Sequence, residues 1–148
     1  YLLFLENVFQ YMDKYRYETG MQAIIEEMTT ILSDDSVGTS ADRACLLDAR
    51  AVLEKNAKKQ IELVEEAIQV LGEVHSGNAH LAANLHANLG ALYHKAGRMD
   101  LAKLYMEQGV QLTSCCGNCE APLKRLQRLS KILCLLLRRL WKPCGGIC

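Results

Sequence analysis

Apolar residues recur at helical spacing in three parts of the chain, and polar or glycine-containing breaks separate these parts. The clearest part is residues 84–110, "NLHANLGALYHKAGRMDLAKLYMEQGV", in which two amphipathic stretches flank the short break "AGR". Apolar residues at i, i+3, i+4 and i+7 mark one side of a helix. Neither stretch can bury that side alone, so the sequence predicts two helices that fold back on each other.

Small residues stand where these two helices are expected to meet. Gly90 and Ala102 allow the two backbones to approach closely, while Tyr93 and Met106 fill the space beside them. Gly97 lies where the chain must leave the first helix through a left-handed conformation. The pattern therefore predicts an antiparallel pair with its turn at Gly97.

The same frame recurs upstream. In "CLLDARAVLEKNAKKQIELVEEAIQVL" Val64 takes the place of Met106, and in "FLENVFQYMDKYRYETGMQAIIEEM" Ile24 does, so the frame advances by 40 and then 42 residues. Three helix pairs follow, with Lys55 at the middle turn. No glycine marks that turn, which leaves open a single helix from Ser40 to Leu71.

Polar loops separate the predicted pairs. "DDSVGTSAD" precedes the second pair and "GEVHSGN" precedes the third. Both are rich in Gly, Ser, Asp or Asn, which are typical of turns. We expect Ser40 to cap the first helix of the second pair.

The last pair resembles the tetratricopeptide repeat, whose pattern is W-x2-L-G-x2-Y followed by A-x3-F and P. His86 stands at the Trp position, Met106 at the Phe position and Ser114 at the Pro position. The long period and "NLGALYHKAGRMDLA" are similar to the longer repeats of kinesin light chains, with their motif NLA-x-L-Y-x-x-x-G-[KR]-x-x-x-A. The resemblance covers about residues 3–114.

This resemblance implies an all-α fold, a short α-solenoid of about three antiparallel helix pairs in residues 1–114. The first helix of each pair would line an inner face that binds a peptide or a partner helix. The candidate partner-binding residues are Asn84, Asn88, His94 and Lys95. The carboxylate clamp of chaperone-binding relatives is not reproduced, because alanines stand at two of its positions.

The net charge of zero hides a strong asymmetry. Residues 121–148 contain three Lys, four Arg and no acid, a net charge of +7. Residues 1–120 contain ten of the 17 basic residues and all 17 acidic residues, which leaves −7. An acidic helical body is therefore followed by a basic tail, residues 115–148.

The tail predicts a C-terminal basic amphipathic helix, since leucines recur along one side of "PLKRLQRLSKILCLLLRRLWK". It suits a helix that caps the array, or one that binds an acidic protein or an anionic membrane. A third interpretation is that the tail is not native to the repeat protein. Its basic patch comprises Lys124, Arg125, Arg128, Lys131, Arg138 and Arg139.

Cysteine and histidine spacing gives no clear metal site. The tail holds "CCGNC" and "CGGIC", but a long predicted helix separates these motifs, which disfavours one four-thiolate zinc site. His86 and His94 lie eight residues apart, about 12 Å along a helix, too far for one ion. We predict His86 to be a packing residue and Cys45 a small buried one, and we expect no metal and no cofactor.

No catalytic motif is present, since the chain lacks a phosphate-binding glycine loop and a serine nucleophile elbow. We therefore predict a non-enzymatic adaptor in the cytoplasm that binds a protein or peptide, without nucleic acid or a small-molecule substrate. Two alternatives remain: a regulatory helical segment of a larger enzyme or motor, or contact with a membrane or acidic partner through the tail.

Overall fold

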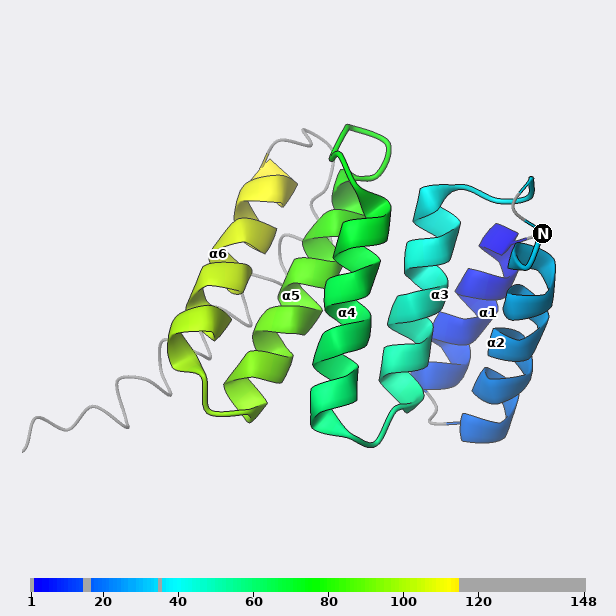
Figure 1. The fold of residues 1–148 in the computed structure, drawn as a ribbon, viewed down its shortest axis with the longest axis horizontal. Coiled ribbons are helices and arrows are strands. Elements are labelled where there is room, and N and C mark those ends of the chain that lie inside the picture. Colours follow the sequence, from blue (N-terminus) through cyan, green and yellow to red (C-terminus); the bar gives the residue numbers. More distant parts are fainter. Residues whose placement is uncertain (1, 15–16, 35, 115–148) are drawn as a thin grey trace, which may run out of the picture.

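The computed structural model describes residues 2–14, 17–34 and 36–114 of the chain. These residues form helices and loops without any β-strand, which confirms the predicted all-α class for this part of the chain (Figure 1). Six helices follow one another: α1 (Leu2–Lys14), α2 (Glu18–Leu32), α3 (Ser40–Leu53), α4 (Ala57–Leu71), α5 (Ala79–Lys95) and α6 (Met99–Ser114).

The three helix pairs stand side by side in chain order, and helices that follow one another in the chain run antiparallel (Figure 1). Each helix contacts the next one along the chain. In addition α1 contacts α3, and α3 contacts α5. In contrast, α2 does not contact α4, and α4 does not contact α6. The first helices of the three pairs therefore share one side of the described molecule, and we call their solvent-facing surface the odd-helix face.

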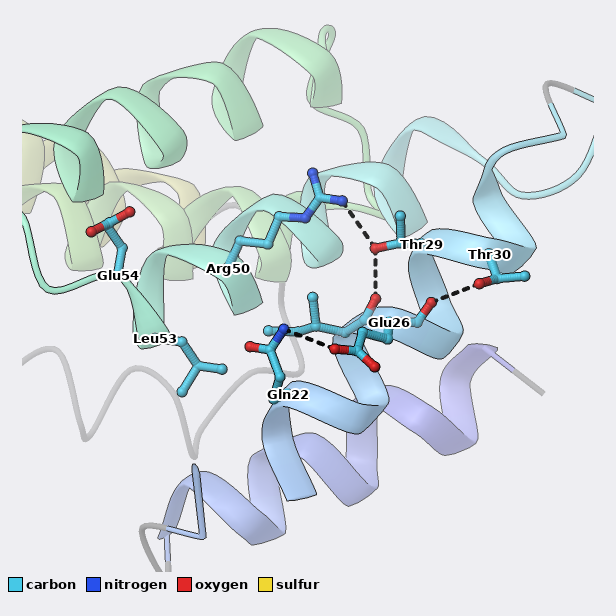
Figure 2. Close-up of a pocket in the computed structure, with 8 residues that line it drawn as sticks. Gln22, Glu26, Thr29, Thr30, Arg50, Leu53 and Glu54 are labelled. Carbon is cyan, nitrogen blue, oxygen red and sulfur yellow. Dashed lines mark hydrogen bonds between the residues drawn. The ribbon is translucent and has the colours of Figure 1, made fainter. Parts of the chain in front are cut away.

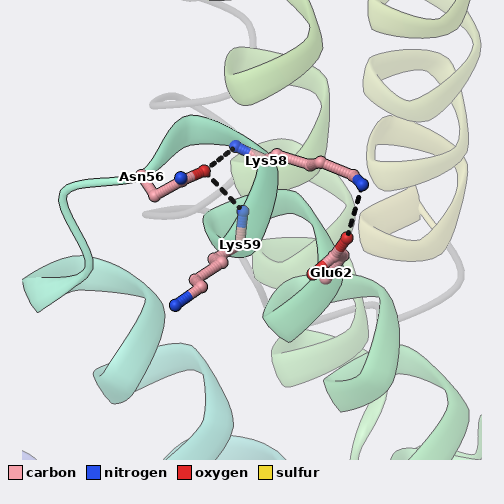
Figure 3. Close-up of polar contacts among 4 residues, drawn as sticks. All are labelled: Asn56, Lys58, Lys59 and Glu62. Carbon is pink, nitrogen blue, oxygen red and sulfur yellow. Dashed lines mark hydrogen bonds and ion pairs between the residues drawn. The ribbon is translucent and has the colours of Figure 1, made fainter.

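The middle pair has a real turn, so the alternative of one helix from Ser40 to Leu71 is wrong. Helix α3 ends at Leu53, and the Asn56 side chain caps α4 by accepting hydrogen bonds from the backbone N–H groups of Lys58 at 3.0 Å and Lys59 at 3.2 Å (Figure 3). Figure 3 also shows the exposed Lys58–Glu62 ion pair in the first turn of α4.

Gln60 holds this turn in place of a glycine. Its amide Nε2 donates to the carbonyl oxygens of Ala51 at 3.2 Å and Glu54 at 2.6 Å. These carbonyls lie at the end of α3, where no following turn of helix satisfies them. A side chain at a position that is alanine in the last pair thus closes the middle turn.

Helix α3 is capped by Thr39, and the expectation that Ser40 would cap it is wrong by one residue. Thr39 is extended, its hydroxyl accepts from the Asp42 N–H, and the Asp42 carboxylate accepts from the Thr39 N–H at 2.7 Å. This reciprocal capping box needs an acceptor side chain three residues after the cap, and Asp42 fits Thr39. Ser40 is already the first helical residue.

Helices α5 and α6 pack as closely as the sequence predicts. A Cβ on Gly90 would lie 2.7 Å from the Met106 Cγ and 3.1 Å from the Ala102 carbonyl oxygen. Gly97 has φ +75°, and the N–H of Arg98 bonds to the Tyr93 carbonyl at 2.9 Å. Gly97 thus ends α5 in the left-handed conformation expected of a C-terminal glycine cap.

Two clusters of buried side chains make up the core, and α3 contributes to both. The first cluster lies among α1, α2 and α3 and contains Leu5, Phe9, Met21, Ile24, Ile25, Met28, Leu32, Leu46 and Ala49. The second lies among α3, α4, α5 and α6 and contains Ala44, Ala51, Val64, Ala67, Leu71, Ala82, Leu85, Leu89, Tyr93 and Ala102.

None of the described helices is long and apolar enough to cross a membrane. The predicted basic helix, its six basic residues and the two cysteine motifs lie outside the described residues.

Candidate partner-binding face

Three of the four predicted partner-binding residues lie on one strip of α5. Asn84, Asn88 and Lys95 are spaced by four and seven residues, which places them within about 40° around the helix axis. Asn84 is half-buried, and Asn88 and Lys95 are exposed. His94 is half-buried and lies about 100° around the helix from Lys95, so the helix does not place it on this strip.

Asn88 joins α5 to α3 across the odd-helix face. Its amide Nδ2 donates to the Asp48 carboxylate, at 3.0 Å from Oδ1 and 3.3 Å from Oδ2. Burial raises the pKa of the Asp48 carboxyl, the hydrogen bond from Asn88 lowers it, and the Asp13 carboxylate raises it, with a net increase. Asp48 is thus a half-buried acid whose bonded partner is neutral.

A second polar contact joins α1 to α3 on this face. The Glu6 and Cys45 side chains are hydrogen-bonded, and the Asp42 carboxylate lies close enough to act on both groups. Burial raises the pKa of the Glu6 carboxyl, the bond with Cys45 lowers it, and Asp42 raises it, with a net increase. The odd-helix face therefore carries acids from α1 and α3 beside amides from α5.

Cys45 is a protected thiol. It is half-buried, less than the full burial that the sequence predicts, and it is not in a disulfide. Burial and then the nearby Glu6 carboxylate raise the pKa of the thiol well above its usual range. The thiolate is the reactive form of cysteine, so Cys45 suits packing and hydrogen bonding better than nucleophilic chemistry.

The histidines of α5 make local contacts. His86 Nδ1 lies 2.8 Å from the Ala82 carbonyl oxygen, and its ring centroid lies 6.0 Å from that of Tyr105. This agrees with the predicted packing role. His80 Nδ1 lies 3.1 Å from the Asn84 amide, one turn away. Across residues 2–14, 17–34 and 36–114, no three His, Cys, Asp or Glu side chains are grouped to hold a metal ion.

Sequence reasoning missed Asp48, Glu6 and Asp13 as residues of this face. A single acid on an amphipathic helix is most often a solvated side chain, and nothing near Asp48 in the sequence sets it apart. The repeat frame gave no signal either, because it advances by 42 residues from the second pair to the third, whereas Asp48 precedes Asn88 by 40. The two residues are therefore not at equivalent repeat positions, and only the packing of α3 against α5 brings their side chains together.

Comparison of the whole chain with protein-family models, with curated protein sequences and with solved structures gives no match.

Proposed function

We propose that the chain is an interaction scaffold, an adaptor that binds a peptide or partner helix along the odd-helix face. The observation that carries the proposal is the arrangement of α1, α3 and α5: α3 contacts both α1 and α5, whereas α2, α4 and α6 do not contact one another. Side chains from three successive pairs thus form one surface, as in a tetratricopeptide-like solenoid.

The chemistry of the face suits a segment of peptide chain. Amides such as Asn84 and Asn88 can both donate to and accept from a peptide backbone. The acids of α1 and α3 favour basic side chains over their part of the face, and Lys95 favours an acid at the other end of the α5 strip. The proposed setting is the cytoplasm, because Cys45 is a free thiol.

Position-specific photo-crosslinking in cells tests the proposal. A photoreactive amino acid at Ala91, on the α5 strip, or at Val52, which is 42% exposed on α3, should capture the same protein. The matched control is Gln111, an exposed residue of α6. Capture from Gln111 but from neither Ala91 nor Val52 would place the partner elsewhere and reject the proposal.

A double substitution tests whether the two amides of the α5 strip bind the captured protein. Asn84→Ala with Asn88→Ala should abolish capture from Ala91, because it removes the two amides of the strip. Since Asn88 also binds Asp48, the thermal midpoint of this variant must be measured alongside. Unchanged capture by a folded double variant would show that the strip does not bind the partner.

A further inference from the structure

The helices α2 and α3 line an open groove of about 570 Å³ on the side away from α1. We call it the Arg50 groove. It forms because α2 and α4 do not touch, so α3 lies open between them. Its lining residues are Gln22, Ile25, Glu26, Thr29 and Thr30 of α2 with Arg50, Leu53 and Glu54 of α3 and the turn after it (Figure 2).

The groove continues along α2 toward the start of that helix. A second hollow shares Gln22, Glu26 and Leu53 with the first and extends it to Glu18 and Lys55. From Glu18 to Thr30 the helix rises about 18 Å, which is the length of about five extended residues. The groove is thus long enough for a short peptide segment.

Arg50 is the cation in the central part of the groove. Its side chain reaches across to α2, where Nη2 donates to the Thr29 hydroxyl oxygen at 2.9 Å (Figure 2). This is the guanidinium's one hydrogen bond or ion pair within the described part of the chain. A guanidinium has five N–H donors and no acceptor, so several donors remain for a ligand.

The other polar groups of the groove mostly accept hydrogen bonds. The hydroxyls of Thr29 and Thr30 donate to carbonyl oxygens of their own helix, at 2.6 and 2.9 Å, which leaves their oxygens as acceptors. Backbone N–H groups lower the pKa of the Glu54 carboxyl, so Glu54 is an anion at neutral pH. Glu26 accepts from the Gln22 amide at 3.2 Å.

This distribution of charge defines the ligand. The Arg50 guanidinium can pair with one carboxylate. The Glu26 and Glu54 carboxylates on the walls of the groove can pair with cations or accept hydrogen bonds from N–H donors. In the central part of the groove a doubly charged phosphate would meet the Glu26 and Glu54 carboxylates and one cation, Arg50, so a single carboxylate fits better. Ile25 and Leu53 provide apolar surface between the charged groups.

We propose that the Arg50 groove binds a peptide segment of a partner protein in which one Asp or Glu is flanked by Lys or Arg. The carboxylate pairs with the Arg50 guanidinium, and the flanking cations lie against Glu26 and Glu54. This surface belongs to the α2–α3 side and is separate from the odd-helix face. Residues 121–148 of the chain itself lack an acid for Arg50 and are not the favoured occupant.

The test measures binding of labelled, end-blocked pentapeptides to the full chain by fluorescence polarisation. The first peptide is Lys-Leu-Glu-Leu-Lys, and the second has Gln in place of Glu. Wild-type protein should bind the first about tenfold more tightly, since a hydrogen-bonded charged pair is lost in the second. The Arg50→Gln variant should bind both peptides equally weakly.

Two further variants separate a pairing role from a structural one. Arg50→Lys keeps the charge but loses the planar fork, so it should restore part of the preference for Glu. Lys103→Gln removes a cation from α6, outside the groove, and should leave both affinities unchanged. Circular dichroism checks that each variant keeps its helices.

Three results would overturn the proposal: no binding of the Glu peptide, equal affinity of wild-type protein for both peptides, or the same Glu preference in folded Arg50→Gln protein. The Asn84→Ala, Asn88→Ala double variant should bind the Glu peptide normally. Failure of the odd-helix face as a binding surface therefore remains distinguishable from failure of the groove.

Discussion

The two core clusters build the same helical hairpins from different kinds of side chain. The cluster of α1, α2 and α3 uses large flexible residues, among which Met21 and Met28 are at most 2% exposed. The cluster of α3 to α6 uses many alanines, five of its ten buried residues, and glycines let α5 and α6 approach closely. Large side chains hold helices apart and fill the space, whereas small ones let backbones touch.

The difference predicts opposite responses to changes of volume. Where large side chains fill the core, removal of atoms leaves a cavity, so truncation should be the damaging change. Where backbones touch, added atoms have no space, so enlargement should be the damaging change. Substitutions in the two clusters test this contrast.

Met21→Ala should destabilise the protein by about 2–5 kcal/mol. Met21 is 2% exposed in the large-residue cluster, and its removal leaves a cavity among α1, α2 and α3. Urea unfolding measures the loss, and hydrogen exchange should show that amides of α2 lose more protection than those of α5. Equal loss of protection in both helices would mean that the two clusters unfold as one unit.

Gly90→Leu should cost about 1–3 kcal/mol, because the new side chain has no space between α5 and α6. Even its first atom would lie 2.7 Å from the Met106 Cγ and 3.1 Å from a backbone oxygen. The control is Gln111→Leu, an exposed position of α6 that should tolerate the same side chain. If Gly90→Leu unfolds at the same denaturant concentration as wild type, the close approach of these helices is wrong.

Sequence reasoning succeeded where small residues fix the geometry. Gly90, Ala102 and Gly97 predicted the last pair in detail, because few residues fit a close backbone approach or a positive φ. The middle turn was ambiguous, since the Gln60 side chain closes it with hydrogen bonds that have no sequence signature, and Asn56, a typical N-cap residue, was the one local sign of a helix start. Many residue types could close such a turn.

The candidate face was predictable only within one helix. The resemblance to longer tetratricopeptide repeats suggested Asn84, Asn88, His94 and Lys95. Helical periodicity places all of them except His94 on a common strip. The Asp48 partner of Asn88 comes from another pair, and its position depends on how α3 packs against α5. The Arg50 groove could not be predicted from the sequence for the same reason: it depends on the gap between α2 and α4 and on no local pattern.

Tyr93→Phe should change the dependence of stability on alkaline pH. The hydrogen bond from the Tyr93 hydroxyl to Glu65, at 2.6 Å, is the largest cause that raises the pKa of Tyr93 to about 12, from a usual value near 10. Between pH 10 and 12 the unfolded chain loses this proton while the folded chain keeps it. The stabilisation that is present below pH 10 is therefore lost as pH rises toward 12.

The pH-dependent part of this effect should be about 1 kcal/mol, because water screens the half-exposed Glu65 carboxylate. Urea midpoints at several pH values between 8 and 12 measure it for wild type and Tyr93→Phe. Wild-type stability should fall more steeply than that of the variant above pH 10. Parallel curves would mean that Tyr93 titrates normally and that its bond to Glu65 is weak.

Aligned positions of the second helices differ in burial from one pair to the next. The frame aligns Met21 of α2 with Ile61 of α4 and Lys103 of α6. These three residues are buried, half-buried and exposed respectively. At the next position Ile25 is buried, whereas Glu107 is exposed and pairs with Lys103 at 3.9 Å. Helix α6 is thus polar at both of these positions, and we call the side that carries Lys103 and Glu107 its outer side.

Lys103→Ala should therefore change stability by less than about 0.5 kcal/mol, the usual value of an exposed helical ion pair. The same truncation at the aligned Met21 should cost several times more, so the two variants measure the contrast at matched positions. Urea midpoints with unchanged slopes give both values.

Because the tail was expected either to cap the array or to bind a partner, the result also bears on residues 115–148. A loss of more than about 1.5 kcal/mol for Lys103→Ala would exceed the range of solvated surface positions. It would show that another segment covers the outer side of α6, and the basic tail that follows Ser114 would be the first segment to test.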